Sequence, residues 1–151
     1  MWRDNPIVLS KITTMVKIFV LSEYSLNPPQ DGQGRVKIAN GPLYALERVQ
    51  ALAQDEDRLK AWTEKCRKDV RKWFDDDLER VGDLILALKP DDYIDSEWCE
   101  NGKGAWAACD AYSISLVETA PATGRPVRME YFVKFAVSKT GALVLIVSCH
   151  A

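Results

Sequence analysis

The chain has 151 residues, of which 47% are hydrophobic and 28% are charged, and its formal net charge is −2 at pH 7. This composition is ordinary for a globular domain with enough apolar side chains for a core, and it excludes a mainly disordered chain. The mild net charge excludes a polybasic nucleic-acid coat, so any RNA or DNA site must be a local patch.

The cysteine and histidine content argues against a metal site. The chain contains no CxxC pair and a single histidine, and its four cysteines stand at positions 66, 99, 109 and 149. This spacing does not provide a standard zinc site or establish a disulfide framework, so we expect no metal, no cofactor and reduced thiols.

The apolar segments near the N-terminus are short. Lys11 and Lys17 interrupt them, which leaves neither a signal-peptide core nor a run long enough to cross a membrane. We therefore predict a cytoplasmic protein without a membrane partner.

Residues 1–40 are predicted to be an N-terminal extension. Residues 16–21 are apolar and form a plausible strand, whereas residues 27–34 contain two prolines and two glycines and are typical of a loop. Residues 41–151 carry the regular patterns and are predicted to form the main domain.

Three helices are predicted in the first half of this domain. Apolar side chains recur at helical spacing over residues 43–54, 57–74 and 78–88. The second segment is rich in lysine and arginine, which we interpret as a solvated helix face in preference to an RNA groove. Lys89-Pro90 ends the third helix.

The pattern then changes to strands. Residues 95–105 are predicted to be a loop, and alternation predicts strands over residues 108–116 and 127–137. A final strand follows over residues 143–150. Helices first and strands afterwards predict an α+β fold, with N-terminal helices packed on one face of a C-terminal antiparallel sheet.

The final strand is the most informative segment. It is an uninterrupted apolar run from Leu143 to Val147, typical of a strand buried on both faces, and it ends in His150, the only histidine. A single titratable imidazole at the end of a buried strand is a candidate for chemistry. The alternative is that His150 is a polar end cap.

The order of several short motifs resembles one known family. The motifs are Ile85-Leu86-Ala87-Leu88-Lys89-Pro90-Asp91-Asp92-Tyr93, Trp106, Asp110-Ala111-Tyr112, Gly124, Tyr131-Phe132-Val133-Lys134-Phe135 and Leu145-Ile146-Val147-Ser148-Cys149-His150. This series resembles the motility quorum-sensing regulator (MqsR) toxins, which have a RelE-like fold. The resemblance implies a toxin domain over residues 41–151, metal-independent mRNA cleavage, and inhibition by a cognate antitoxin in a type II toxin–antitoxin pair.

The catalytic positions of that family carry over only in part. They fall on Asp95, Cys109, Phe132 and His150 of this chain, in place of the family's lysine, glutamine, tyrosine and lysine. Either the active site is rebuilt around His150, or the activity has been lost.

Metal-free RNA cleavage needs a base for the ribose 2′-hydroxyl, an acid for the leaving 5′-oxygen, and cations for the phosphorane. With a pKa near ~6.5, a histidine can act as acid or base, which contributes about 10²–10⁴-fold in rate. The candidate catalytic residues are His150, Lys134 for charge stabilisation and Glu130 as carboxylate base. The candidate substrate-binding residues are Arg128, Phe132, Tyr131, Tyr112 and Lys89.

Whether these residues meet depends on the register of the last hairpin. A four-residue loop over residues 138–141 pairs Val137 with Ala142 and places His150 opposite Met129, on the apolar face. A five-residue loop over residues 139–143 pairs Ser138 with Val144 and places His150 opposite Phe132, on the polar face. We expect the five-residue loop, because it matches the family alignment.

Two functions therefore compete. The first is a ribonuclease toxin that uses His150 with Lys134. The second is a non-catalytic protein-interaction module with the same fold, favoured by the partial carry-over of catalytic residues.

Overall fold

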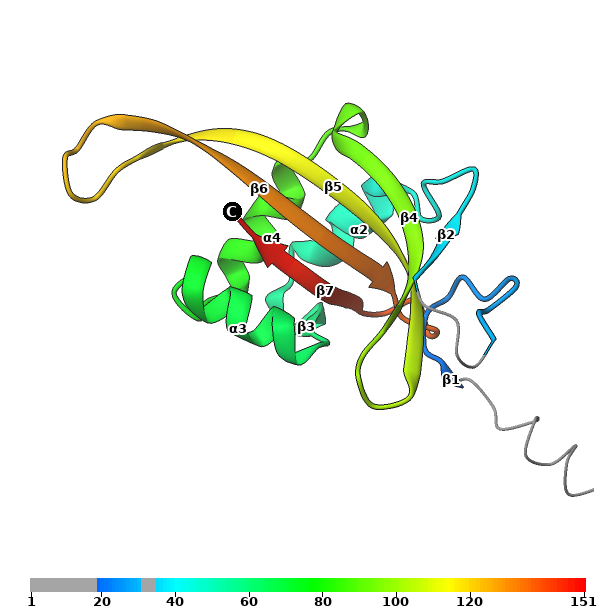
Figure 1. Ribbon diagram of the computed structural model, residues 1–151. Helices are drawn as coiled ribbons and strands as arrows, with labels where there is room; N and C mark the ends of the chain where they lie inside the picture. The colour runs from blue at the N-terminus through cyan, green and yellow to red at the C-terminus, as the bar shows by residue number, and fades with distance from the viewer. Residues whose placement is uncertain (1–18, 31–34) are drawn as a thin grey trace, which may run out of the picture.

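A computed structural model describes residues 19–30 and 35–151 of the chain. Within these residues, seven strands form one sheet and three α-helices pack against it (Figure 1). The strand order is β2-β4-β5-β6-β7-β3, and β1 pairs separately with β5. In chain order the strands are β1 (Phe19–Val20), β2 (Val36–Ile38), β3 (Leu59–Ala61), β4 (Tyr93–Glu100), β5 (Ala105–Thr119), β6 (Pro126–Val137) and β7 (Val144–His150).

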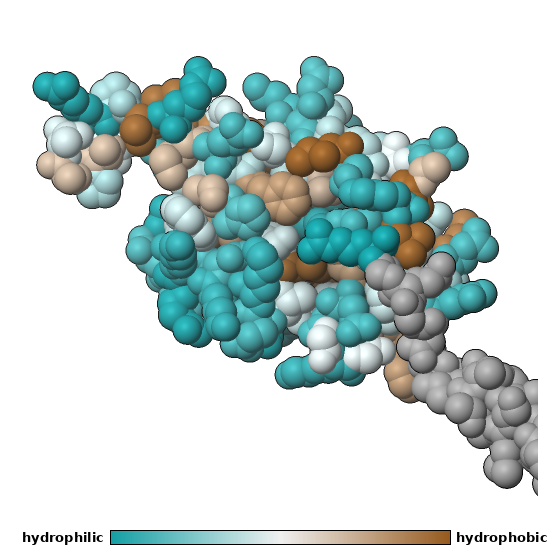
Figure 2. Space-filling model, viewed as in Figure 1, coloured by the Kyte–Doolittle hydropathy of each residue, from teal (hydrophilic) through white to brown (hydrophobic). Residues whose placement is uncertain are grey.

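The two longest strands, β5 and β6, form the centre of the sheet and extend beyond it as a two-stranded arm (Figure 1). The arm begins beyond Tyr112 of β5, which faces the first residue of β4, and beyond Phe132 of β6, which faces the last residue of β7. Val117 and Val127 on the arm are exposed. Figure 2 shows a largely hydrophilic surface over α3, and hydrophobic side chains on the arm and the sheet.

The helices are α2 (Leu46–Ala53), α3 (Glu64–Trp73) and α4 (Leu78–Ala87). Local capping fixes two of their starts. The Thr63 hydroxyl accepts from the Cys66 amide at 2.9 Å and donates to the Val147 carbonyl at 2.6 Å, which ties the start of α3 to β7. Asp77 accepts from the Glu79 amide at 3.0 Å and caps α4. The predicted first and third helices are confirmed.

The predicted second helix, over residues 57–74, is wrong in its first part. Glu56–Arg58 forms a 3₁₀ turn, and Leu59–Ala61 is the strand β3, which pairs in parallel with β7 from Leu59↔Val144 to Ala61↔Ile146. Strand β7 is paired with β6 on one edge, so the other edge leaves backbone groups that β3 satisfies. This long-range pairing overrides the local helical spacing of residues 57–62.

The predicted loop over residues 95–105 is also wrong. Residues 93–100 form β4, an inner strand between β2 and β5, and only residues 101–104 remain as a turn to β5. Strand β2, a segment too short to assign from its pattern, pairs with β4 from Val36↔Trp98 to Ile38↔Ser96. Of the apolar segment 16–21, Phe19–Val20 forms β1, and residues 16–18 lie outside the described residues, as do residues 31–34 of the predicted loop.

The predicted architecture, an α+β fold with N-terminal helices packed on one face of a C-terminal antiparallel sheet, is wrong, and with it the RelE-like arrangement. The sheet dominates the structure and is mixed, because the β1–β5 and β3–β7 pairs are parallel. Strands β1, β2 and β3 precede or separate the helices. The helices do not make up one layer across the sheet, since α2 and α4 lie side by side whereas α3 lies along β7.

The main core lies between β5, β6 and β7 of the sheet and the apolar sides of α2 and α4. Its fully buried members include Val49, Val81, Ile85, Phe135 and Ile146. Residues Val144 to Cys149 of β7 are all buried, which confirms the prediction that this strand is covered on both faces. A smaller cluster centred on Trp98, Trp106 and Ala108 receives apolar side chains of β1 and β2.

Candidate functional site

The pairing of β6 with β7 determines where His150 lies. Next to the loop, Val137 pairs with Val144, so that the loop spans residues 138–143 and is one residue longer than the longer of the two predicted loops. The register then shifts between Lys134 and Phe135, and Val147 is the extra residue of a β-bulge. Beyond the bulge His150 pairs with Phe132, as predicted. The loop differs from the predicted one by one residue, and the bulge shifts the register back by one residue, so the predicted pair forms by a different route.

The His150 ring is half-buried and stacks on Phe132, with ring centroids 5.2 Å apart and an angle of 24° between the rings. Strand alternation puts both side chains on the face of the sheet that also carries Lys134 and Ser148. His150 therefore does not lie in the core beside Met129, and the stack fixes the plane of its ring.

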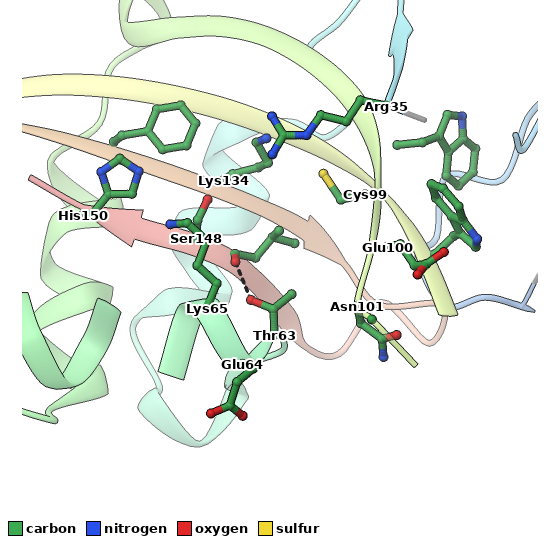
Figure 3. Close-up of a pocket in the computed structure, with 15 residues that line it drawn as sticks. Arg35, Thr63, Glu64, Lys65, Cys99, Glu100, Asn101, Lys134, Ser148 and His150 are labelled. Atoms are coloured by element: carbon green, nitrogen blue, oxygen red, sulfur yellow. Dashed lines mark hydrogen bonds between the residues drawn. The ribbon is translucent and has the colours of Figure 1, made fainter. Parts of the chain in front are cut away.

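His150 lies at the edge of a cavity of about 790 Å³. Its walls come from β4, the turn after β4, the start of β5, β6, β7, the start of α3 and the residue before β2 (Figure 3). The charged side chains at the cavity are Arg35, Lys65 and Lys134 together with the carboxylates Glu64 and Glu100. Ser148 and His150 also line it, and apolar parts come from Trp98, Trp106 and Phe132. The volume is within the range of ligand pockets, which is about 300–1,000 Å³.

A buried ion pair underlies one wall of this cavity. The Lys134 ammonium pairs with Glu97 of β4, and the two side chains are only 8% and 4% exposed. The other Glu97 carboxylate oxygen accepts no hydrogen bond from any described residue, and the Lys37 ammonium is 3.7 Å from it. The Lys134 nitrogen also lies 5.7 Å from the centre of the Phe132 ring. The carboxylate next to Lys134 is therefore Glu97 and not Glu130, the predicted carboxylate base.

Two further cations stand at the cavity, and both are exposed. Lys65 on α3 pairs with Asp69 at 2.9 Å, one helical turn away. Arg35 makes no ion pair with any residue that the structure describes. Neither cation was predicted from the sequence, because Lys65 belongs to a helix that looked uniformly basic and Arg35 adjoins a loop.

The structure brings together three of the sequence-predicted site residues, namely His150, Lys134 and Phe132. Glu130 lies on the same face but outside the cavity, exposed on the arm, where the Ser113 hydroxyl is 3.3 Å from its carboxylate. Arg128 is exposed further along the arm, opposite Val117.

The remaining predicted residues lie elsewhere. Tyr112 is buried and stacks on Phe135, with centroids 5.5 Å apart. Tyr131 faces the helices and donates to the Glu118 carboxylate at 2.7 Å. Lys89 is exposed just after α4. The sequence pattern placed these three residues correctly on strands and at a helix end. The face on which each side chain lies, and how deeply it is buried, depended on the tertiary structure.

The four positions that correspond to the toxin family's catalytic residues share one face of four neighbouring strands. Paired residues on neighbouring strands share a face, and the pairs are Glu97 with Cys109, Ala111 with Lys134 and Phe132 with His150. Residues two apart on one strand also share a face, so Asp95 lies on the same face as Glu97 and therefore as Cys109, Phe132 and His150. Only Phe132 and His150 line the cavity. Asp95 pairs with Lys37 at 2.5 Å, and Cys109 is fully buried.

The chain matches no known family, and neither curated proteins nor solved structures show significant similarity to it. Among the described residues, no helix is both long and apolar enough to span a membrane. In the same part of the chain, no three histidine, cysteine or acidic side chains are grouped so that they could hold a metal ion. The candidate site is therefore defined by its own geometry, which is a cavity with charged and aromatic walls and one imidazole at its edge.

Proposed function

We propose that this protein is a metal-independent endoribonuclease that acts as the toxin of a type II toxin–antitoxin pair, as its resemblance to the MqsR toxins implies. The observation that carries the proposal is the position of His150. The chain's only imidazole is half-buried, has its ring plane fixed by Phe132, and lies at a cavity that also contains Arg35, Lys65 and Lys134.

In this proposal, RNA lies across the cavity with a phosphate near His150. The imidazole removes the proton of the ribose 2′-hydroxyl, whose oxygen attacks the adjacent phosphorus and displaces the 5′-oxygen. The leaving oxygen takes a proton from the imidazolium or from water, which gives a cyclic phosphate and a free 5′-hydroxyl. Proton transfer of this kind contributes about 10²–10⁴-fold in rate.

The cations divide into two kinds in this scheme. Arg35 and Lys65 are exposed, and they can bind the phosphate backbone directly. Lys134 is buried and already paired with Glu97, so its charge is largely neutralised, but two of its three N–H groups remain for the phosphorane oxygens. Glu97 holds this ammonium at the wall of the cavity.

The aromatic side chains suit a nucleobase. Trp98, Trp106 and Phe132 line the cavity, and stacking of a base on an aromatic ring is worth about 1–3 kcal/mol without demanding a particular sequence. In this proposal mRNA is the substrate, a cognate antitoxin is the protein partner, and the cytoplasm is the place of action.

The second candidate function is a non-catalytic protein-interaction module. It is favoured by the neutralisation of Lys134 and by the residues at three of the family's catalytic positions, namely Asp95, Cys109 and Phe132. In this case the cavity binds without cleaving.

The test is cleavage of purified mRNA in the presence of a chelator. We expect the wild-type protein to cut RNA and His150→Gln to lose about 10²–10⁴-fold in rate while its thermal unfolding is unchanged. Arg35→Met should weaken RNA binding at low salt, and Arg125→Met, on the exposed arm, is the matched control. Intact transcripts, or cleavage that survives in His150→Gln, would refute the ribonuclease proposal.

Expression in cells separates the two functions. A ribonuclease toxin arrests growth, and His150→Ala relieves the arrest. If growth continues and transcripts survive while the protein still captures a specific protein partner, the interaction module is the function.

A further inference from the structure

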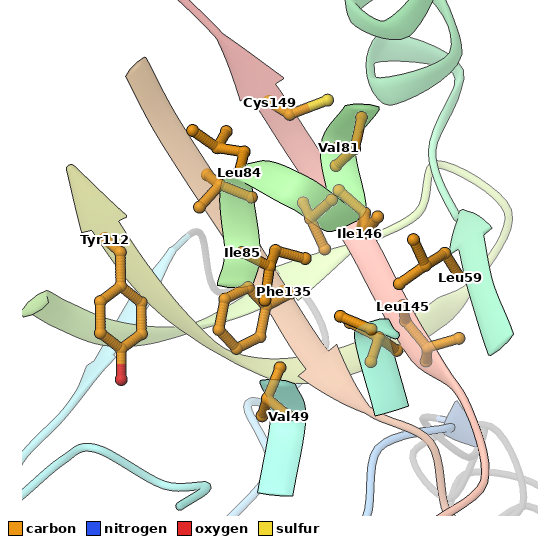
Figure 4. Close-up of a cluster of buried hydrophobic side chains, with 14 of the residues drawn as sticks. Val49, Leu59, Val81, Leu84, Ile85, Tyr112, Phe135, Leu145, Ile146 and Cys149 are labelled. Carbon is orange, nitrogen blue, oxygen red and sulfur yellow. The ribbon is translucent and has the colours of Figure 1, made fainter. Parts of the chain in front are cut away.

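The four cysteines differ in their access to solvent. Cys66, Cys109 and Cys149 are fully buried, whereas Cys99 is 8% exposed and lines the cavity (Figure 3). Cys149 lies within the core (Figure 4), with its sulfur 3.9 Å from that of Cys66. Among the four thiols, only Cys99 can be reached by a molecule that enters the cavity.

The surroundings of Cys99 favour its thiolate. The neighbouring Cys109 thiol and the nearby Lys134 and Arg35 cations lower the pKa of Cys99, despite burial and the Glu97 charge. Burial raises the pKa of Cys109 well above its ordinary value, so Cys109 keeps its proton. A partly accessible thiol close to cations is typical of reactive cysteines.

We propose that Cys99 is a covalent modification site, at which a small disulfide that carries carboxylates, such as glutathione disulfide, forms a mixed disulfide inside the cavity. The Cys99 sulfur attacks one sulfur of the reagent, and the reagent's S–S bond breaks as the new S–S bond forms. The other half leaves as a thiolate and takes a proton from water. Cys99 and one reagent half share the new bond, and the leaving half is reduced.

The cavity suits this class of ligand in size and charge. Its volume of about 790 Å³ accommodates a tripeptide adduct. Arg35 and Lys65 are exposed at the cavity and can pair with the carboxylates of the adduct, and Glu64 and Glu100, which also line it, can pair with the adduct's ammonium group.

Cys109 is poorly placed to displace the adduct by forming an internal disulfide. Cys99 pairs with Ala107 and Cys109 pairs with Glu97, so the two cysteines are diagonal neighbours on adjacent strands. Diagonal neighbours are typically about 7–8 Å apart, beyond the Cα separation of about 4.4–6.8 Å that disulfides need. The mixed disulfide therefore persists until an external thiol removes it.

Such an adduct would occupy the space next to Lys134 and keep a phosphate away from His150. This consequence rests on the proposed ribonuclease function, whereas the reactivity of Cys99 does not. The modification would then switch RNA cleavage off reversibly under oxidising conditions.

The experiment exposes the folded full-length protein to glutathione disulfide and measures intact mass over time. We expect one glutathione per chain, its removal by dithiothreitol, no adduct in Cys99→Ser, and an unchanged adduct in the control Cys66→Ala.

Peptide mapping of the wild-type protein gives the same answer without any variant. Tryptic cleavage after Lys103 separates Cys99 from Cys109, and the adduct is expected on the Cys99 peptide alone. The proposal is overturned if the folded protein takes up no adduct while the urea-unfolded protein does. It is also overturned if a buried cysteine reacts as fast as Cys99. An adduct on Cys99 that leaves RNA cleavage unaffected supports the modification site and overturns only its effect on the proposed function.

Discussion

The buried pair of Lys134 and Glu97 gives the sharpest prediction about stability. Both side chains are more than nine-tenths buried, so removal of either partner leaves a charge in a poorly hydrated site. Breaking such a pair from one side typically costs about 3–5 kcal/mol because the other charge is left uncompensated, and a second change that removes this charge adds little further loss. The losses of the two single variants should therefore not add in the double variant.

The two single variants are not equivalent. In Lys134→Met, Glu97 keeps a cation, because the Lys37 ammonium is 3.7 Å from its second oxygen. In Glu97→Gln, Lys134 loses its carboxylate partner, and no other ion pair joins it to a residue that the structure describes. We expect a loss of about 3 kcal/mol in the free energy of unfolding for Lys134→Met and about 4 kcal/mol for Glu97→Gln.

The double variant Glu97→Gln/Lys134→Met should lose about 4 kcal/mol, well below the sum of the single losses, which corresponds to a coupling of about 3 kcal/mol. Urea unfolding followed by fluorescence of the five tryptophans measures all three values. Lys65→Met is the matched control. The side chain of Lys65 is 61% exposed and its pair with Asp69 lies on the helix surface, so the loss should stay within about 0.5 kcal/mol. Single losses below about 1 kcal/mol, or losses that simply add, would refute the reasoning.

Two further predictions concern packing and alkaline stability. Gly82→Ala should lower the free energy of unfolding by about 1–2 kcal/mol although alanine favours helices, because the added Cβ would lie 2.9 Å from the Ala53 carbonyl oxygen. Urea unfolding measures this loss, and the control Asp83→Ala, at an exposed neighbouring position, should change the free energy of unfolding by no more than about 0.5 kcal/mol. A stabilised Gly82→Ala would contradict the close packing of α2 and α4. Burial raises the pKa of Tyr112 and of Tyr131 to about 12, above the ordinary value of about 10. Since the folded state holds these phenol protons more tightly, their contribution to stability is complete below about pH 10 and is lost as the pH rises toward 12. Urea unfolding across this range should show a smaller loss for Tyr131→Phe than for the wild type, and equal losses would show that Tyr131 is not the cause.

Local patterns in the sequence were sufficient to predict two of the helices and the strands that pair with the next strand along the chain. The apolar spacing of residues 43–54 and 78–88 predicted α2 and α4, because an amphipathic helix satisfies its backbone groups internally. The alternation along residues 127–137 predicted β6, and the unbroken apolar run predicted a doubly buried β7. The sequence also singled out His150 and its pairing with Phe132.

Pairing between distant segments decided the rest, because a strand's hydrogen bonds are made by another part of the chain. Leu59–Ala61 has helical spacing but is a strand, since β7 offers it a free edge. Glu97 was assigned to a loop, and only the place of β4 next to β5 brings it to Lys134. The loop of residues 138–143 and the bulge at Val147 each shift the register by one residue, so their combined effect on His150 could be known only from the folded sheet. The sequence by itself determined which side chains are capable of chemistry, and the tertiary structure decided which of them share one cavity.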